Sequence, residues 1–525
     1  MHYRIFNSFF GLALLFSFFS CFILTGAFAQ GNSGTQQITG KVTDESGTGV
    51  SGVTVAVKGS QVATQTDVNG TYTINAPSNG VLVFSSVGFV TSEVDIRDRG
   101  IVNAALSTQT SNLNEVVVVG FGTQRKVDLT GAVASVTRKD FANRPFTSPD
   151  QILGGRVPGV NIANRSGDPG APIDVRIRGV GTTGNNQPLW VIDGVPIVQT
   201  TNMTVNTGSS TESNPLAGIN TNDIESIDVL KDASAAAIYG ARAANGVIII
   251  TTRRGKEGRT SLTYDGSYGV QYVPKDKRFD LLNVDEYIAL QTELDPNRDL
   301  SKFKGQPAVD WQDAIFQRGP VHNHNLTLSG GSQKATFNVG AGYLENTGVE
   351  LGQGFKRLSL KVNSDINVGK YLRFGESVLV SSVNRNTQTE GGLFAAFNGS
   401  LNAPYYKIYD PNGPLGYNIE TNETHGEGAT GVNYVWRSDR RIDNTTIQQK
   451  KFLGSVYGEF EPIAGLKYRF TAGADYNVGD GYFFQEAADF GTEQRRSLLA
   501  QERPLELTTN ISQTLTYHKI LGKSD

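Results

Sequence analysis

The sequence predicts a mainly β protein in three parts: a small N-terminal β-sandwich, a mixed α/β domain, and the first strands of a large antiparallel transmembrane β-barrel. Composition is the first indication, because 60 glycines and only 18% charged residues among 525 are typical of turn-rich β-structure. The second is a set of short strand-like runs before residue 255, and the third is the long polar–apolar alternation that follows it.

Net charge and cysteine content exclude several classes of protein. The formal net charge is −3 without a basic block, which argues against a nucleic-acid partner. Cys21 is the one cysteine and lies in the N-terminal apolar segment, so the exported chain would hold together without disulfides. No apolar run after that segment reaches the length of a membrane-spanning helix. If the protein enters a membrane, it therefore does so with strands.

Residues 1–29 are typical of a secretory signal peptide. Arg4 supplies the basic start, an apolar run extends from Phe9 to Leu24, and the segment ends in Ala27-Phe28-Ala29. We expect cleavage between Ala29 and Gln30. A membrane-anchored N-terminus is the alternative, but no polar stop-transfer flank supports it, and the residues before Cys21 fit a lipid-attachment box poorly.

Residues 36–107 predict a small β-sandwich. Short apolar runs such as Val53–Val57 and Val81–Phe84 alternate with turn residues such as Asn69-Gly70. A segment of this length and spacing is enough for two small packed sheets. The segment Asp67–Gly70 has its glycine too early for a calcium-binding loop, so we expect a tight turn there.

Residues 108–126 form a linker with an isolated strand candidate, in which Glu115 precedes Val116, Val117, Val118 and Val119. The residues alone leave two interpretations open. The run can be the first strand of the next domain, which is the commoner role for a short β-branched segment. It can also be a strand that is donated to a partner by edge addition.

Residues 127–255 predict a mixed α/β domain. Ser148 caps and Pro149 opens a short helix, and two strand-like runs, at 174–180 and 188–197, follow it. The domain closes with Asp223–Gly255: a strand, an alanine-rich helical turn that Gly240 ends, and a β-branched strand. This closing unit contains no candidate nucleophile, metal cluster or phosphate loop, and its small residues favour close packing.

From residue 256 onward, apolar and polar side chains alternate in roughly eight segments. In the stretch 466–478, Tyr468 and Phe470 share one face, whereas Lys467, Arg469 and Asp475 share the other. A soluble sandwich also alternates. These segments, however, are about twelve residues long with tyrosines near their ends, which suits a tilted strand that crosses a bilayer. We therefore predict the N-terminal part of a transmembrane barrel over residues 256–525.

The segment Asn214–Gly255 resembles the signature that closes the plug domain of SusC/RagA-like TonB-dependent outer-membrane transporters. The resemblance extends over essentially the whole chain. It implies that residues 36–107 are a carboxypeptidase-regulatory-like domain, that 127–255 are the plug, and that Glu115–Val119 are the TonB box, which TonB captures as an added strand. The positions that match the plug signature are Arg178, Gly179, Asp193, Gly194, Asp232, Tyr239, Gly240, Asn245 and Gly246.

The resemblance also implies a function: TonB-dependent active import of an oligomeric nutrient, a glycan or a peptide, across the outer membrane of a Gram-negative cell. It implies TonB with ExbB and ExbD as energy-transducing partners, a SusD-like surface lipoprotein as a lid, and no cofactor. Wide plugged transporters have about 22 strands, and about eight cannot enclose a plug. We therefore expect these 525 residues to be the N-terminal portion of a longer barrel or a truncated gene product.

Three other functions have less support. An extracellular binding protein built from β-domains leaves the plug signature unexplained, and a signalling TonB-dependent receptor usually has a further N-terminal domain. The residues give little support to a secreted hydrolase. His322 and His324 share one side of a strand, but no third metal ligand is nearby. The glycine-rich segment 179–186 lacks the lysine of a phosphate loop. We expect no catalytic activity and no metal site.

Overall fold

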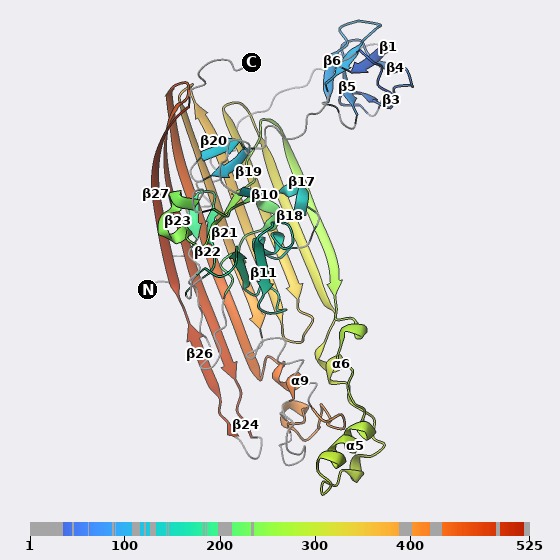
Figure 1. The fold of residues 1–525 in the computed structure, drawn as a ribbon, viewed down its shortest axis with the longest axis vertical. Helices are drawn as coiled ribbons and strands as arrows, with labels where there is room; N and C mark the ends of the chain where they lie inside the picture. Colours follow the sequence, from blue (N-terminus) through green and yellow to red (C-terminus); the bar gives the residue numbers. More distant parts are fainter. Residues whose placement is uncertain are drawn as a thin grey trace. The chain divides into compact units, whose positions relative to one another are not determined.

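The computed structural model describes residues 35–518 with internal gaps (Figure 1). The gaps are 45–46, 61, 87–88, 90, 108–115, 120–121, 126–132, 143, 145, 182–183, 185, 198–212, 233–235, 388–401, 420–432 and 490–493. The chain divides into two compact units between Leu113 and Asn114. The predicted signal peptide and its cleavage site at Ala29 and Gln30 lie outside the described residues. No helix in the described part of the chain is long and apolar enough to cross a membrane.

The N-terminal unit is a sandwich of two small sheets, as the sequence predicts. One sheet has the strand order β4-β1-β7 and the other has the order β3-β2-β5-β6. Alternate residues of β1, β4 and β5 enter a shared core that includes Ile38, Tyr72 and Phe84. The Asp67 carboxylate accepts hydrogen bonds from two backbone N–H groups, as expected for a tight turn. The strands are β1 (Thr35–Asp44), β2 (Thr54–Val57), β3 (Ala63–Gln65), β4 (Thr71–Pro77), β5 (Val81–Ser85), β6 (Ser92–Asp95) and β7 (Ala104–Leu106).

A hairpin of β8 (Val116–Val119) and β9 (Gly122–Arg125) precedes the plug domain. Its antiparallel register pairs Val116 with Arg125 and Val119 with Gly122. Cα atoms of β8 lie within 8 Å of Cα atoms of the plug strand β15 (Ile224–Leu230). Glu115 lies outside the described residues. The valine run therefore forms a strand whose pairing partner belongs to the same chain.

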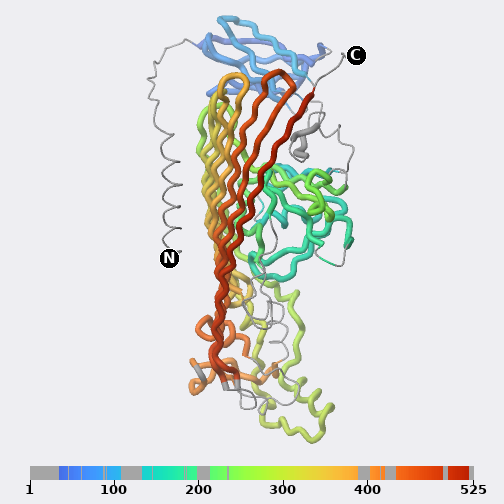
Figure 2. Tube along the Cα trace, turned by 90° about the vertical axis from the view of Figure 1, so that its left-hand side faces the viewer, coloured from blue at the N-terminus to red at the C-terminus, as the bar shows by residue number. Residues whose placement is uncertain are grey.

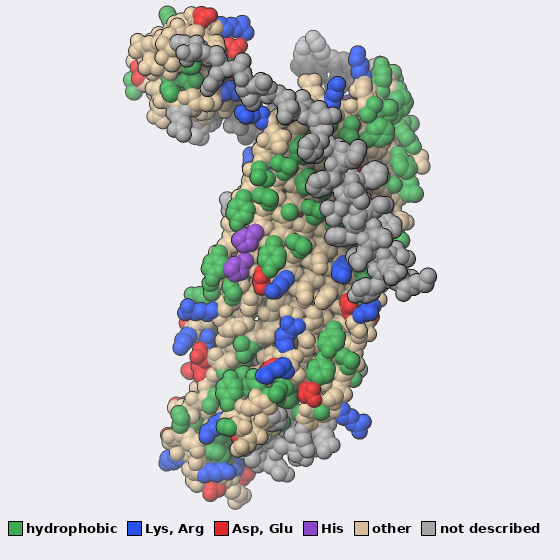
Figure 3. Space-filling view, turned by 180° about the vertical axis from the view of Figure 1, so that it is seen from behind, with side chains coloured by type: hydrophobic (Ala, Val, Ile, Leu, Met, Phe, Trp, Pro, Cys, Tyr) green, Lys and Arg blue, Asp and Glu red, His purple; other side chains and the backbone are tan. Residues whose placement is uncertain are grey.

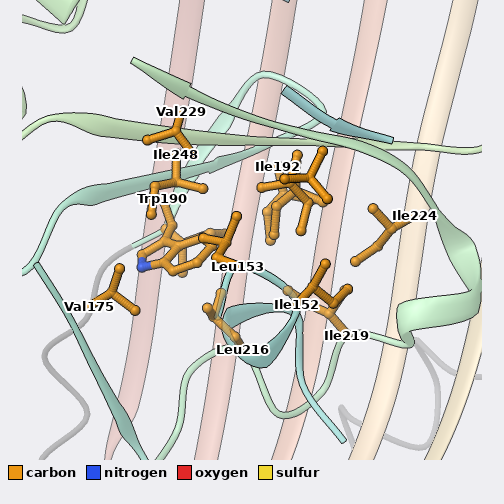
Figure 4. Close-up of a cluster of buried hydrophobic side chains, with 14 of the residues drawn as sticks. Ile152, Leu153, Val175, Trp190, Ile192, Leu216, Ile219, Ile224, Val229 and Ile248 are labelled. Atoms are coloured by element: carbon orange, nitrogen blue, oxygen red, sulfur yellow. The ribbon is translucent and has the colours of Figure 1, made fainter. Parts of the chain in front are cut away.

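The plug domain is built on a mixed sheet of order β10-β15-β16-β13-β14. β15 pairs antiparallel with β10 and β16, whereas β13 runs parallel to β16. Side chains from this sheet, from α3 and from the segment before β15 meet in one hydrophobic cluster around Trp190 (Figure 4). The elements are β10 (Val133–Thr137), α2 (Arg138–Phe141), α3 (Pro149–Ile152), β11 (Val160–Asn164), β12 (Ile173–Ile177), β13 (Leu189–Ile192), β14 (Val195–Ile197), η2 (Thr221–Asp223), β15, η3 (Ala237–Ala243) and β16 (Val247–Thr252).

Two local predictions for the plug domain, at Ser148 and at Gly240, have different outcomes. A helix begins at Pro149 as expected, but the Ser148 hydroxyl donates to the Asp150 carboxylate instead of capping the helix. The serine is buried beside that carboxylate, and its hydroxyl oxygen accepts no hydrogen bond from the first turn of the helix. Gly240, with a φ of 68°, interrupts the alanine-rich segment as expected, and a second short helical turn follows it.

Nine strands of the second unit form one antiparallel sheet (Figure 1). Eight of the nine have at least 13 residues, in agreement with the roughly eight alternating segments of the sequence. The strands are β17 (Gly258–Gln271), β18 (Gly319–Gly331), β19 (Ala335–Thr347), β20 (Gly354–Val368), β21 (Leu372–Thr387), β22 (Asp443–Ile463), β23 (Leu466–Gln485), β26 (Leu498–Glu502) and β27 (Leu505–Tyr517). The predicted fold class is thereby confirmed.

The two ends of this sheet differ in their connections. At one end the strands are joined by short turns at residues 332–334, 369–371 and 464–465. At the other end the connections include 272–318 and 388–442, and these two carry the helices outside the plug. The elements at this loop end are η4 (Lys275–Lys277), α5 (Val284–Leu294), η5 (Ser301–Phe303), α6 (Trp311–Ile315), η6 (Pro414–Gly416), α9 (Tyr434–Arg437), β24 (Ala488–Asp489) and β25 (Gln494–Arg495).

The plug domain packs against one face of the large sheet, as Figures 1 and 2 show from two directions. Leu379 of β21 and Leu453 of β22 belong to the hydrophobic cluster of the plug. A Cβ atom at Gly473 of β23 would lie 2.5 Å from the Val195 side chain, so the absence of a side chain there allows close approach. The two parts are therefore in direct packing contact.

Candidate functional site between the plug domain and the sheet

The large sheet buries its polar side chains and exposes its apolar ones. On β20, Arg357 and Lys361 are 2% and 1% exposed. Their neighbours Leu358 and Leu360 lie on the opposite face and are 61% and 44% exposed. A strand of a soluble protein has the reverse arrangement, because burying a charge is costly unless it is paired and exposing leucine gains nothing. The alternation is that of a strand between lipid and a polar interior.

The exposed apolar side chains form a continuous band, which we call the apolar belt, on the face away from the plug. Strand register places them side by side: Tyr264 is level with Leu326, and Leu360 is level with Val380. Figure 3 shows hydrophobic side chains spread over the upper and middle part of this face. The large exposed members are Leu262, Tyr264, Leu326, Leu358, Leu360, Ile366, Val368, Leu372, Phe374, Phe452, Val456, Phe460, Phe470, Leu507, Ile511 and Leu515.

The apolar belt ends on the loop side at a row of mostly polar residues. Strand register aligns the row, which we call the polar row: Tyr268, His322, Glu345, Lys356, Asn384, Gln448 and Asp480. Within it, Lys356 and Glu345 form an ion pair of 2.8 Å. Aromatic rings lie at this boundary as well, where Tyr264 and His324 share a hydrogen bond of 2.7 Å. Aromatic and polar side chains at the edge of an apolar band are typical of a membrane–water boundary.

The histidines His322 and His324 share the outer side of β18, as the sequence predicts, with ring centres 6.5 Å apart. Among the residues that the structure describes, no group of three or more His, Cys, Asp or Glu side chains could hold a metal ion.

The plug-facing side of β20 makes a series of contacts with the plug, and we call these alternate residues the docking face of β20. Arg357 donates from Nη1 to the backbone carbonyls of Thr147, Ala217 and Ile219, at 2.6, 3.2 and 2.8 Å. One guanidinium thus binds two separate segments of the plug. The docking face comprises Phe355, Arg357, Ser359, Lys361, Asn363 and Asp365.

One of these contacts is a buried ion pair between Lys361 and Asp193. Lys361 Nζ lies 2.8 Å from Asp193 Oδ2, and the two side chains are 1% and 3% exposed. Ser377 of β21 also donates to this carboxylate, at 2.6 Å. Burial alone would raise the pKa of Asp193, but Lys361 and Arg254 outweigh that effect and hold the pKa below its usual range. The plug carboxylate is therefore ionised and held by the sheet.

Backbone geometry explains why Asp193 can reach the sheet. Asp193 and Gly194 connect β13 to β14, and both have positive φ, 46° and 86°. This is the left-handed geometry of a two-residue hairpin turn, which favours an Asp-Gly pair. The same carboxylate accepts from the backbone N–H of Thr252 at 2.9 Å, at the end of β16. One side chain thus joins a turn, the last plug strand and the large sheet.

Further polar contacts surround this ion pair. Asn363 donates to the Arg253 carbonyl at 2.6 Å, and Arg254 lies 2.9 Å from Asp365. Asp223 packs against β19, and burial raises its pKa to about 6 even though Lys361 and Arg357 lower it. The residues after β16 are therefore fixed to the sheet just before the chain enters β17.

The other signature positions lie within the plug domain and support its fold. Arg178 has a positive φ of 58° and forms an ion pair of 2.5 Å with Asp232. Gly246 has a φ of 87°, and a Cβ atom there would lie 2.7 Å from Ile177 Cδ1. The remaining members are Gly179, which has a positive φ, Tyr239, which is buried beside β16, Gly240 in its kink, and Asn245, which donates to the Gln187 carbonyl.

Sequence reasoning missed the docking face of β20. The signal is present in Phe355–Asp365, where Arg357, Lys361 and Asp365 alternate with Leu358 and Leu360. The alternation identifies a strand with one charged face. It does not reveal the partner, because the contacts join residues more than a hundred positions apart.

Comparison with known proteins places these features in a family. A model of the TonB-dependent receptor plug domain matches residues 125–247, and a model of the CarboxypepD_reg-like domain matches residues 38–118. TonB-dependent receptor P26 of Formosa agariphila is 34% identical over 451 residues, which cover 84% of this chain and 43% of the relative. TonB-dependent receptor SusC of Bacteroides thetaiotaomicron is 34% identical over 474 residues, which cover 87% of this chain and 46% of the relative.

A solved structure agrees with these sequence relatives. The RagAB peptide importer in its open-open state superposes with a TM-score of 0.62 at 25% identity, over 77% of this chain and 47% of that one. The chain spans less than half the length of the curated relatives that it matches. With its plug domain, its CarboxypepD_reg-like domain and about 34% identity over most of its own length, the chain is a homologue of the SusC-like TonB-dependent receptors.

Proposed function

We propose that the chain takes part in TonB-dependent import of an oligomeric nutrient across the outer membrane. The observation that carries this proposal is the large sheet, which exposes an apolar belt on one face and holds a globular domain against its polar face. An apolar outer face suits lipid, and a polar inner face filled by a plug suits a closed passage. The short turns lie on the periplasmic side in this arrangement, and the loop end faces outward.

The segment Glu115–Val119 is the proposed capture site for TonB. β8 pairs with β9 along one edge, and the described residues place no strand along its other edge. An unpaired edge can accept a strand from a partner through main-chain hydrogen bonds. TonB, driven by ExbB and ExbD and the inner-membrane proton gradient, would pull this segment and with it the plug.

A glycan is the proposed cargo, with a peptide as the alternative. The resemblance of the sequence to SusC/RagA-like transporters supports the glycan, and similarity to the RagAB peptide importer supports the peptide. The same relatives support a SusD-like surface lipoprotein as a partner at the loop end. The relatives are receptors and importers, and we propose that this chain has no catalytic activity and no cofactor.

TonB capture is tested with two proline variants of the hairpin in the full chain. Val118→Pro removes a backbone donor from the free edge of β8, because Val118 lies in a pair that is not hydrogen-bonded to β9, and it is expected to lower copurification with TonB roughly tenfold. Gln124→Pro makes the same change in β9, opens the pairing with β8, and leaves the valines intact, so TonB binding should persist. Equal binding by Val118→Pro and the unchanged protein would contradict the capture site.

Import itself is tested by membrane fractionation and by uptake in cells with and without TonB. We expect the chain in the outer-membrane fraction and uptake of labelled oligosaccharide only when TonB is present. Recovery in the soluble fraction would favour an extracellular binding protein. Outer-membrane location with transcriptional induction but without uptake would favour a signalling receptor.

A further inference from the structure

Three basic residues of the sheet have partners that belong to the plug. Lys361 pairs with Asp193 at 2.8 Å, and Arg385 of β21 lies 3.2 Å from Asp168. Arg357 binds three plug carbonyls. We call Lys361, Arg385 and Arg357 the docking cations. They come from the neighbouring strands β20 and β21 and face the same side of the sheet.

Other charged residues on the same side of the sheet are balanced within the sheet itself. Asp475 pairs with Lys451 at 2.7 Å, and both belong to the sheet. Glu459 lies 3.0 Å from Lys467, again within the sheet. Asp365 lies 3.4 Å from Arg373 in addition to its contact with the plug. In the described part of the chain, the docking cations differ from these neighbours because each contacts a plug group: Asp193 for Lys361, Asp168 for Arg385, and three backbone carbonyls for Arg357.

We propose that the docking cations form a binding site for acidic cargo, and that the plug carboxylates Asp193 and Asp168 occupy this site while the passage is closed. This inference rests on the proposed function, because the site becomes accessible only when the plug moves. When the plug moves and takes Asp193 with it, Lys361 still donates to the neutral Ser377 hydroxyl, at 2.6 Å. The ammonium group has then lost the negative charge of Asp193, so binding another anion becomes favourable. Basic side chains that line a passage select anions.

The cargo class follows from this charge. Carboxylates or sulfates repeated along an oligomer would replace Asp193 and Asp168 one after another, with hydrogen bonds of the same kind. The site therefore fits an acidic oligosaccharide, such as a uronate polymer, or an acidic peptide. A neutral oligomer would not replace the negative charge that Asp193 and Asp168 bring to Lys361 and Arg385, which is unfavourable in a confined passage.

The test compares uptake of acidic and neutral oligomers in the same cells that express the full chain. One probe pair is a labelled oligogalacturonate with a neutral galacto-oligosaccharide of equal length, and the other is oligoglutamate with oligoglutamine. We expect Lys361→Gln to lower the acidic-to-neutral uptake ratio about fivefold, which is the effect of one charge near a solvated anion. Because both probes enter the same cells, differences in protein amount cancel in the ratio.

Asp193→Asn is the matched variant, since it removes the same ion pair from the plug side and leaves the docking cations in place. The ratio for Asp193→Asn should stay at or above that of the unchanged protein. Equal ratios in Lys361→Gln and Asp193→Asn would overturn the inference and leave the pair as a structural contact only. An unchanged acidic-to-neutral uptake ratio in Lys361→Gln, with uptake that still depends on TonB, would also overturn the inference. Uptake that does not depend on TonB would overturn the proposed function itself.

Discussion

Asp193 combines a backbone role with an electrostatic one. Its positive φ belongs to the tight β13–β14 turn, and its carboxylate accepts from Lys361, Ser377 and Thr252. A substitution therefore changes either the turn or the contact with the sheet, depending on what it removes. Asparagine tolerates the left-handed conformation, so Asp193→Asn isolates the electrostatic role.

Removing Lys361 should loosen the plug more than removing an exposed lysine. Lys361→Met leaves Asp193 buried without its counter-ion, and we expect a loss of about 3–5 kcal/mol in the free energy of opening the contact. Lys58→Met removes an exposed pair with Glu93 and should cost less than about 1 kcal/mol. Hydrogen exchange of the β13–β14 and β2 amides in detergent measures the two costs. Similar protection of β13–β14 in Lys361→Met and the unchanged protein would refute this ranking.

Asp223 should make the stability of the plug depend on pH. Burial raises its pKa from 3.8 to about 6, so the folded plug holds a proton that the unfolded chain has lost within this window. The free energy of unfolding should therefore fall as the pH rises from 3.8 to about 6. Asp223→Asn removes this contribution, and denaturant titrations across the window measure the difference. If the free energy of unfolding falls by the same amount in Asp223→Asn, groups other than Asp223 cause the pH dependence.

Glycines of the plug differ in what they contribute to its elements. Gly246 precedes β16, and a Cβ atom there would lie 2.7 Å from Ile177 Cδ1. Gly155 also has a positive φ, 69°, but a Cβ atom there would have no neighbour within 4 Å. We expect Gly155→Ala to cost about 1 kcal/mol from backbone strain alone. Gly246→Ala should cost about 2–3 kcal/mol, because strain and overlap add.

Thermal or denaturant unfolding of the plug measures these two costs, with the protection of the β16 amides from hydrogen exchange as the readout. If Gly155→Ala lowers the free energy of unfolding more than Gly246→Ala does, close packing against β12 is not the reason for glycine at position 246.

Elements with a local signal were predictable from the sequence, and elements held by distant contacts were not. The helix at Pro149 and the alternation of Lys467 with Tyr468 each depend on neighbouring residues, whereas the Asp193-Gly194 turn divides the predicted strand run 188–197 into β13 and β14. The role of Lys361 depends on Asp193, which lies 168 positions earlier. A local signal can also mislead, because the Ser148 hydroxyl donates to the Asp150 carboxylate two residues later and makes no side-chain cap. The β8 strand was predicted, but its pairing with β9 was not.

The whole sheet should tolerate charge on its outer face only outside the apolar belt. Leu360 lies within the belt, and Leu360→Arg should destabilise insertion by about 2–4 kcal/mol, as a basic residue does near the middle of a bilayer. Gln448 lies in the polar row, and Gln448→Arg should cost no more than about 1 kcal/mol. Folding into lipid vesicles, measured by denaturant titration, compares the two. Equal costs would mean that the apolar belt does not contact lipid.

The polar row has a consequence for any partner that is itself anchored in lipid. From Gln448 in the polar row, β22 continues toward the loop end as far as Asp443, which is roughly 17 Å along the strand and about 13 Å of height at a strand tilt of about 40°. The helices α5, α6 and α9 therefore stand clear of the bilayer surface. A lipoprotein that docks on them needs at least about four extended residues between its acylated cysteine and its first folded element. The height of this rim thus sets a minimum tether length for any lipoprotein that docks there.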